Sequence, residues 1–493
     1  MMLDTMTFLD QEQVVWILIA GFFLTFLLSF SIGANSVANA FGTSVGSKVL
    51  SHFQAVILAA IFMTLGGVII GPEVANTIEN NIVDIRLYEL EPEQLMLGQL
   101  SVILACTVWK FIATAFKLPV AATHSAVGAV VGFHYMATGI DGIKWVSLLF
   151  IGMSWVTSPL LSGIVALVLY VIVLMTIVEK ENPLESGART LPIWFGSVIF
   201  VNVLSVHLRL KSLFEEFAVP WYLSVAYSFG TALLAAILVW FCFVPRLTNE
   251  KKPENEALLG VEMTVFRMEG DKSALDRSNE NDNSLQAKSD QSEELQTMDI
   301  LHGTGNPDVA KICTPLLVVS VIFSAFAYGS ILVSIGVAPL ITIWDVYKTG
   351  NVTTAVANPF WMFLYGSFAL TLGFAVIGGR VTETIGEGIT PLSPSSAFPI
   401  ELGATTVLLL ASNLGIPVST AHCKIGAIAA VGCYNDEGVD LKLIWKILLA
   451  WVVTLPATTG LSAGFMALFQ FTYQYTTGED ISSNNTSLLQ GIL

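Results

Sequence analysis

Long apolar runs dominate this chain and limit its fold more than any other feature. Most of them approach or exceed the roughly 20 residues that an α-helix needs to cross a bilayer. Because lipid offers no hydrogen-bond partner to free backbone groups, we expect an all-α, polytopic membrane protein with about 10–12 hydrophobic segments. The runs lie at 14–33, 54–71, 98–115, 119–137, 146–178, 192–208, 221–244, 314–340, 360–378, 402–414, 417–433 and 443–472.

The composition supports this class. Charged residues make up 12% of the 493 residues, about half of their share in soluble domains. The net charge of −16 lies largely in loops and tails, so it implies no basic partner, and no nucleic acid is expected. The five cysteines lack metal-type spacing and are expected to be buried free thiols. Without a basic region or a cleavage site before it, the first apolar run is predicted to be a retained span.

One polar stretch divides the chain. Residues 246–310 are rich in Lys, Glu, Asp, Asn, Ser and Gln and poor in aromatics, a composition typical of disorder. We therefore predict a first membrane half at 1–245, a cytoplasmic connector at 246–310, a second membrane half at 311–472 and a polar tail at 473–493.

The two halves repeat each other in order. The matching pairs are 33–37 with 329–333, 74–78 with 381–385, 119–129 with 417–427, and 154–159 with 450–456. Segments 98–115 and 119–137 form one short pair that starts and ends on the same side, so an odd number of segments separates the copies. The repeats are therefore predicted to be inverted, with re-entrant-type hairpins, as in many secondary transporters.

The stretch 33–47 combines glycines, hydroxyl residues and two asparagines, Asn35 and Asn39, with Val, Ala and Phe. Such a sequence makes a poor continuous membrane helix. We predict a broken helix that lines a polar cavity, because open backbone at this depth needs such surroundings. A solvated loop just beyond the span is the alternative.

The proline-led hairpin motifs are the best pointers to a binding site. A proline in the first turn of a half-helix leaves the next N–H groups unpaired at a positive dipole end, and hydroxyls beside them favour a small oxyanion. The alternative is that these hydroxyl residues only allow close helix packing. The candidate residues are Thr123, His124, Ser125, Ser419, Thr420 and His422.

His124 and His422 are either proton-responsive groups or polar residues that fix the hairpin tips. Neither has a Cys, Asp or Glu at metal-ligand spacing, so no zinc site is expected. The stretch 390–396 shares the hydroxyl and proline character, which makes Ser395 and Ser396 further substrate candidates. An ordinary connecting loop is the alternative for that stretch.

Three ionisable residues lie inside apolar runs: Lys110, Glu401 and Lys424. They are functional candidates because burying charge in a membrane is costly. The alternatives are a snorkelling Lys110 and an interfacial Glu401. The tryptophans are interpreted as interfacial anchors or core: Trp109, Trp155, Trp361, Trp445 and Trp451. No phosphate-binding glycine loop and no catalytic triad is visible, so we expect neither an enzyme nor an ATP-driven pump, and no organic cofactor.

Charge and glycosylation-type triplets predict the orientation. An external N-terminus places the basic loops at Lys48 and at 180–189 in the cytoplasm, and the acidic loop 79–93 outside. The triplets at Asn351, Asn484 and Asn485 also fall outside. Arg209 and Lys211 are exceptions, because this topology places them outside whereas basic residues prefer cytoplasmic loops. The plasma membrane with both termini outside is the expected location, and an intracellular membrane is the alternative.

These motifs resemble those of the inorganic phosphate transporters of the PiT type, mainly sodium–phosphate symporters in eukaryotes. The resemblance covers both hydrophobic halves. It lies in 33–43, similar to the signature Gly-Ala-Asn-Asp-Val-Ala-Asn, and in 119–128, 390–396 and 417–426. It implies a helical bundle with inverted repeats, commonly a homodimer, that binds phosphate and sodium near the midplane. The implied sodium ligands are Asn35, Ser36, Asn39, Ser330 and Ser334, and the first three would also contact the substrate.

The chain departs from the family pattern at its signature. Ser36 stands where the first copy has aspartate, and 329–335 reads Gly-Ser-Ile-Leu-Val-Ser-Ile where the second copy has Gly-Gly-Asn-Asp-Val-Ser-Asn. Leucine and isoleucine offer a hard cation no ligand, although backbone carbonyls could still coordinate sodium. The first hypothesis is a sodium-coupled phosphate transporter. The others are a transport-impaired sensor or receptor, and a carrier of another oxyanion or one driven by protons.

Overall fold

The structure is a computed structural model that describes residues 11–213, 220–249, 306–354, 360–413, 418–435 and 438–478. These residues form helices, with a single isolated bridge between Val83 and Ile143. The predicted connector at 246–310 lies almost wholly outside the described residues. The first half contains α1 (Gln11–Ser36), α2 (Ala38–Gly46), α3 (His52–Leu58), α4 (Thr64–Ile82), α5 (Pro92–Ala115), α6 (Ala122–Thr138), α7 (Trp145–Val173), α8 (Pro183–Leu213), α9 (Trp221–Cys242) and α10 (Val244–Asn249).

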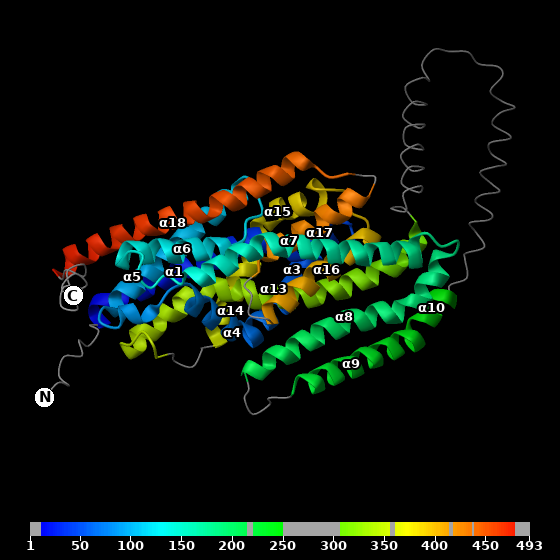
Figure 1. The fold of residues 1–493 in the computed structure, drawn as a ribbon, viewed down its shortest axis with the longest axis horizontal. Helices are drawn as coiled ribbons and strands as arrows, with labels where there is room; N and C mark the ends of the chain where they lie inside the picture. The colour runs from blue at the N-terminus through cyan, green and yellow to red at the C-terminus, as the bar shows by residue number, and fades with distance from the viewer. Residues whose placement is uncertain are drawn as a thin grey trace, which may run out of the picture.

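The second half contains α13 (Pro307–Thr349), α14 (Phe360–Gly373), α15 (Gly379–Glu383), α16 (Pro394–Asn413), α17 (Thr420–Tyr434) and α18 (Leu441–Thr477). Short π-helical turns join α3 to α4, extend α7, and continue α14 through α15 to Gly388. In Figure 1, α1 starts and α18 ends at one end of the bundle, whereas α10 lies at the other.

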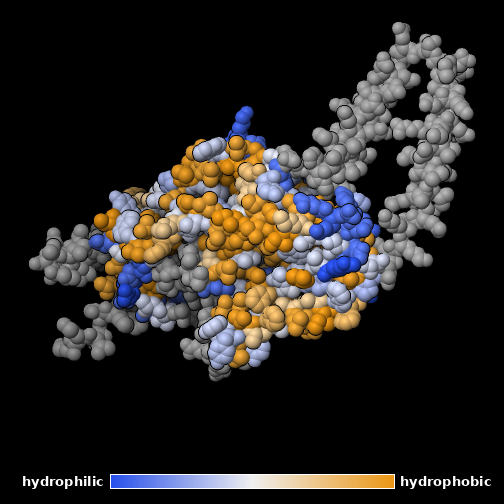
Figure 2. Space-filling view, turned by 45° about the vertical axis from the view of Figure 1, so that its right-hand side comes forward, coloured by the Kyte–Doolittle hydropathy of each residue, from blue (hydrophilic) through white to orange (hydrophobic). Residues whose placement is uncertain are grey.

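Among the described residues, ten helical segments are long and apolar enough to cross a membrane, which confirms the predicted polytopic all-α fold. Their outward faces carry large apolar side chains, and Figure 2 shows hydrophobic surface over the middle of one face with hydrophilic patches toward its ends. The prediction of buried thiols was partly wrong. Cys242 and Cys433 are exposed, whereas the other three cysteines are buried.

Glycine crossings pair helices of opposite halves at equivalent positions of the two copies. A Cβ on Gly33 of α1 would lie 1.8 Å from the carbonyl oxygen of Leu370 in α14. At the equivalent position in α13, a Cβ on Gly329 would lie 2.3 Å from the carbonyl oxygen of Met63 at the start of α4. Each signature glycine therefore permits backbone contact with a helix of the other half, and the two crossings mirror each other.

Each hairpin starts and ends on one side of the bundle. Asp84 N donates to Gly142 O at 2.9 Å, which ties the segment before α5 to the segment after α6. Asp440 N donates to Ile389 O at 2.9 Å and does the same for the segments around α16 and α17. Among the candidate spans are α5 and α16 but not the shorter return helices α6 and α17. Each hairpin thus returns through a shorter helix, of 17 residues in α6 and 15 in α17.

The return helices pack against the other half in a mirrored way. Thr459 Oγ1 of α18 donates to Gly128 O of α6 at 3.0 Å. Ser162 Oγ of α7 donates to Cys423 O of α17 at 2.8 Å. In Figure 1 the pair α5 and α6 lies toward one end of the bundle, and α16 and α17 toward the other. The two half-helices therefore approach the middle from opposite sides.

The two signature copies differ in the backbone. The helix is only slightly disturbed at Val37, between α1 and α2: this residue keeps helical dihedral angles (φ −65°, ψ −26°), and the Asn39 amide donates to Ser36 O at 3.0 Å. By contrast, α13 runs as one helix from 307 to 349 through the second copy. Ile331, Leu332 and Ile335 are buried apolar residues. They need no hydrogen-bond partners, so they fit the interior of an unbroken helix.

Candidate functional site

The first turns of α6 and α17 meet through their histidines. The ring centroids of His124 and His422 are 4.5 Å apart. His124 stacks on Trp155 at 3.8 Å, and His422 stacks on Trp451 at 3.7 Å. These tryptophans, interpreted from sequence as anchors or core, form walls around the histidine pair.

Two hydrogen bonds hold this arrangement across the repeats. Trp451 Nε1 of α18 donates to Pro119 O in the first hairpin at 2.9 Å. His422 Nδ1 lies 3.0 Å from Trp155 O of α7, and this contact makes Nδ1 the donor. Each hairpin tip is thus oriented by a hydrogen bond with the helix that follows the other hairpin.

Several buried polar atoms near the histidine pair have no hydrogen-bond partner among the described residues. They are Thr123 Oγ1, His124 Nδ1, Trp155 Nε1, Ser158 Oγ and His422 Nε2. Buried polar groups in proteins nearly always have a partner, protein or water. A cluster of unpaired atoms from three helices therefore favours a site that a polar ligand completes.

The two half-helix N-termini differ in capping. Ala121 precedes α6 and provides no side-chain cap, whereas Ser419 precedes α17 and accepts a hydrogen bond from His422 N at 3.3 Å. Ser125 Oγ donates to Ala121 O at 3.2 Å, so the hydroxyl keeps only its acceptor side free. The first turn of α6 therefore has unpaired N–H donors at its positive end, which suit an anion.

Asn35 fixes the extended segment that leads into α6. Its Nδ2 donates to Leu118 O at 2.9 Å and to Thr114 Oγ1 at 3.1 Å, and its Oδ1 accepts from Val120 N at 3.0 Å. The hypothesis that Lys110 snorkels was wrong, because its side chain is fully buried and donates to Ser36 Oγ at 2.8 Å and to Val120 O at 2.7 Å. The structure thus joins the first signature copy to the first hairpin.

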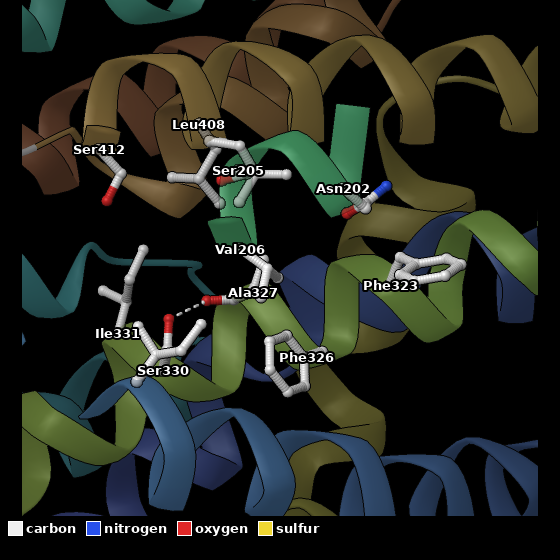
Figure 3. A pocket seen from close by; sticks show the side chains of 12 residues that line it. Asn202, Ser205, Val206, Phe323, Phe326, Ala327, Ser330, Ile331, Leu408 and Ser412 are labelled. Atoms are coloured by element: carbon white, nitrogen blue, oxygen red, sulfur yellow. Dashed lines mark hydrogen bonds between the residues drawn. The ribbon is translucent and has the colours of Figure 1, made fainter. Parts of the chain in front are cut away.

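The remaining sodium candidates lie elsewhere or are already bonded. Ser330 Oγ donates to Ala327 O at 2.8 Å, and Ser334 Oγ donates to Gly71 O and Ser330 O at 2.8 and 2.6 Å. Neither hydroxyl bonds to the first signature copy in the described chain. In Figure 3, Ser330 and Ile331 instead line a pocket with Asn202 and Ser205 of α8.

Ser395 and Ser396 form part of the start of α16 rather than of a hairpin tip. Ser396 N donates to Ser393 Oγ at 3.3 Å, and Ser393 N donates to Ser396 Oγ at 3.0 Å. Ser395 Oγ lies 2.9 Å from Ser393 Oγ. This reciprocal pattern is a helix cap. It accounts for the hydroxyl-rich motif at 390–396 without a ligand.

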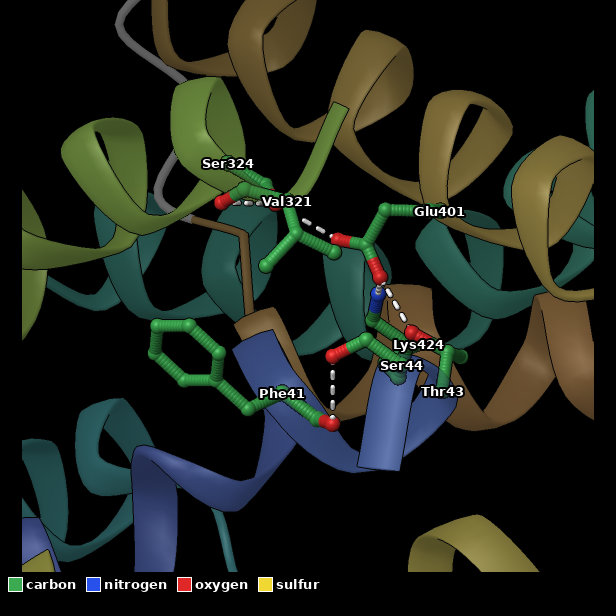
Figure 4. Close-up of polar contacts among 7 residues, drawn as sticks. All are labelled: Phe41, Thr43, Ser44, Val321, Ser324, Glu401 and Lys424. Carbon is green, nitrogen blue, oxygen red and sulfur yellow. Dashed lines mark hydrogen bonds and ion pairs between the residues drawn. The ribbon is translucent and has the colours of Figure 1, made fainter. Parts of the chain in front are cut away.

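A buried ion pair links the second hairpin to both signature helices. Lys424 Nζ lies 2.6 Å from Glu401 Oε2, and both side chains are fully buried. Ser324 Oγ of α13 donates to Glu401 Oε1 at 2.6 Å, and Thr43 Oγ1 of α2 donates to Oε2 (Figure 4). The hypothesis of an interfacial Glu401 was therefore wrong. Opposite charges on the two arms of one hairpin were a signal for this pair.

The profile of a family described as the phosphate transporter family matches residues 32–462. Sodium-dependent phosphate transporter 1-A of Danio rerio is 28% identical, with 94% of this chain and 96% of that protein covered. Sodium-dependent phosphate transporter 1 of Rattus norvegicus is also 28% identical, with 92% and 95% covered. A solved structure described as the sodium-dependent phosphate transporter aligns with a TM-score of 0.74 at 29% identity, over 92% of this chain and 99% of that one.

Proposed function

The chain belongs to the phosphate transporter family, and from this premise we propose that the phosphate it transports binds between the N-termini of α6 and α17. Its family and its relatives make it a secondary transporter of inorganic phosphate and not an enzyme. The observation that carries the site is the 4.5 Å approach of His124 and His422, surrounded by buried polar atoms without partners.

The roles of the site residues follow from their donors. The N–H groups at the start of α6 and the Thr123 hydroxyl can donate hydrogen bonds to an anion. Thr420 and Ser419 supply the matching first turn of α17, and Ser125 adds an acceptor for a protonated phosphate oxygen. Each histidine retains one buried ring nitrogen without a partner among the described residues. The site therefore recognises a tetrahedral oxyanion through many directed hydrogen bonds.

Sodium is the coupling ion that we propose, because the relatives named above are sodium-dependent. Asn39 is its candidate ligand, because its Oδ1 is buried without a partner among the described residues, whereas the oxygens of Asn35 and Ser36 already accept from Val120 N and Lys110 Nζ. We assign no ligand role to Ser330 and Ser334, whose hydroxyls donate to backbone carbonyls. Alternating access by movement of the mirrored hairpins fits the inverted repeat.

Uptake of radiolabelled phosphate tests this function. Purified protein in liposomes should take up phosphate faster than empty liposomes, and faster with sodium outside than with choline. Equal uptake by protein-containing and empty liposomes would contradict transport. Phosphate binding without uptake would favour a sensor or receptor. Competition of sulfate with labelled phosphate shows whether another oxyanion is carried. The dependence of phosphate uptake on pH shows whether protons replace sodium as the coupling ion.

The location and assembly follow from the sequence predictions. We propose the plasma membrane, with both termini outside, on the basis of the loop charges and the triplet at Asn351. The bundle axis fits this proposal, because α1 starts and α18 ends at the same end of the structure (Figure 1). A homodimer is a further proposal from the family resemblance, and the mass of the detergent-solubilised protein tests it.

A further inference from the structure

We propose that the ammonium group of Lys110 is a built-in cation that fills the oxygen cage beside Ser36, so that Asn35 and Ser36 bind no coupling sodium ion. This inference rests on the proposed phosphate transport. It concerns the ion that accompanies the substrate, and its test measures sodium separately from phosphate.

The ammonium group lies in a cage of oxygens. Lys110 Nζ is 2.7 Å from Val120 O, 2.8 Å from Ser36 Oγ and 3.5 Å from Asn35 Oδ1. Its three N–H donors thus have three acceptors. A backbone carbonyl, a hydroxyl and an amide oxygen are also the donor types that bind hard cations. The same cage cannot hold a sodium ion while the ammonium group occupies it.

The charge of Lys110 is not balanced by an ion pair. The side chain is 0% exposed, and its described neighbours within bonding distance are neutral oxygens. In the part of the chain that the structure describes, the buried carboxylate of Glu401 pairs instead with Lys424. An unpaired positive charge inside a membrane protein is costly unless it has a function or a counter-ion from outside the chain. An anionic substrate bound nearby supplies such a counter-ion.

The residue at position 36 agrees with this role. The family signature that 33–43 resembles has an aspartate there, and an aspartate with a bound sodium ion adds to zero charge. Ser36 with the Lys110 ammonium adds to one positive charge in the same place. A carboxylate at position 36 would pair with Lys110 and cancel this charge. Serine leaves the charge in place and still contributes one oxygen to the cage.

The cage is connected directly to the substrate site. Val120 accepts from Lys110 through its carbonyl and donates to Asn35 through its N–H, and it lies just before the first turn of α6. The charge of Lys110 therefore adds to the positive end of the α6 dipole, where an anion would bind. In the second copy, Ile331 and Leu332 replace the amide and the carboxylate of the family pattern.

The test measures co-transport of labelled sodium and labelled phosphate in liposomes. The variants are Ser36→Asp, Lys110→Gln and the double variant with both changes. We expect the double variant to move one sodium ion more per phosphate than the wild type, because the cage is then empty and carries a carboxylate. Ser36→Asp alone should leave the ratio unchanged, because Lys110 still fills the cage. Lys117→Gln is the matched control: this exposed lysine of the same hairpin pairs with Glu383 at 3.0 Å, and its loss should not change the ratio.

Two results would overturn the inference: a higher sodium ratio in Ser36→Asp alone, or an unchanged ratio in a folded double variant that transports phosphate. If the double variant fails to fold, the comparison of Ser36→Asp with wild type decides, because an accessible cage would gain an ion there. If no form transports phosphate, the proposed function fails, and equilibrium binding of labelled sodium to the purified proteins still decides whether Lys110 occupies the cage.

Discussion

The imidazole rings of His124 and His422 lie 4.5 Å apart at the point where the two inverted repeats meet. Each ring stacks on a tryptophan of the helix after its own hairpin, and His422 also bonds to the carbonyl of Trp155 in the other half. A ligand held between the two first turns would therefore touch both repeats. Movement of one hairpin relative to the other would change the site itself, which is what alternating access needs.

The Thr123 hydroxyl should contribute directly to phosphate affinity. It is buried without a partner in the described chain, so Thr123→Val removes a donor without breaking an internal bond. A hydrogen bond to a charged group is worth about 1.5–3 kcal/mol, so the KM for phosphate should rise roughly ten- to a hundredfold. Thr107→Val is the control, because that hydroxyl donates to Ile103 O within α5. Equal effects of both variants on uptake kinetics would contradict the assignment.

The ion pair of Glu401 and Lys424 should behave as one unit. Glu401→Gln leaves the buried ammonium group uncompensated, which costs about 3–5 kcal/mol of stability. The double variant Glu401→Gln with Lys424→Met should recover part of this loss. Thermal unfolding of the wild type, both single variants and the double variant in detergent measures the coupling. Purely additive losses would show that the two side chains do not depend on each other.

The mirrored glycine crossings should be equally intolerant of a side chain. In Gly33→Ala and Gly329→Ala the new Cβ would lie 1.8 and 2.3 Å from backbone carbonyl oxygens, so the helices must separate. We expect each change to destabilise the protein by about 1–3 kcal/mol or more and to impair uptake. Gly152→Ala in α7 is the control, since its Cβ would meet nothing within 4 Å. Full stability of either crossing variant would contradict the packing described here.

Labelling of single cysteines tests the orientation. After the exposed Cys242 and Cys433 have been replaced by serine, cysteine is introduced at Asn351 or at Lys180, both exposed. A membrane-impermeant maleimide added to intact cells should label the first position and not the second, because the two lie on opposite sides of the proposed topology. The reverse pattern would place the N-terminus in the cytoplasm.

Much of the fold could be predicted from sequence because membrane spans are encoded by local hydropathy and the repeat by ordered matches. The segment 98–115 became α5 and 119–137 became α6 with small shifts. The broken helix predicted for 33–47 is reduced in the structure to a slight disturbance at Val37, which keeps helical dihedral angles within one helical segment from 11 to 46. The unbroken helix in the second copy follows from Ile331 and Leu332, whose side chains give no reason for a break.

The site was harder to predict because its contacts join residues far apart in the chain. The motifs identified Thr123, His124 and His422, but neither tryptophan partner had a local signal that set it apart from an interfacial anchor. Lys110 was noticed as an ionisable residue, yet only the structure shows that it contacts Ser36 and Val120. The serines at 395 and 396 show a second difficulty, because hydroxyls near proline also make helix caps, and the sequence does not separate the two roles.

The most direct test of the proposed site is a density map of the protein prepared in phosphate. We expect density for a tetrahedral anion between the first turns of α6 and α17, within hydrogen-bond distance of the Thr123 hydroxyl and the α6 N–H groups. The same map from protein in sodium chloride without phosphate should lack it. Phosphate density elsewhere in the bundle, with the space between these turns filled by side chains in both maps, would contradict the account.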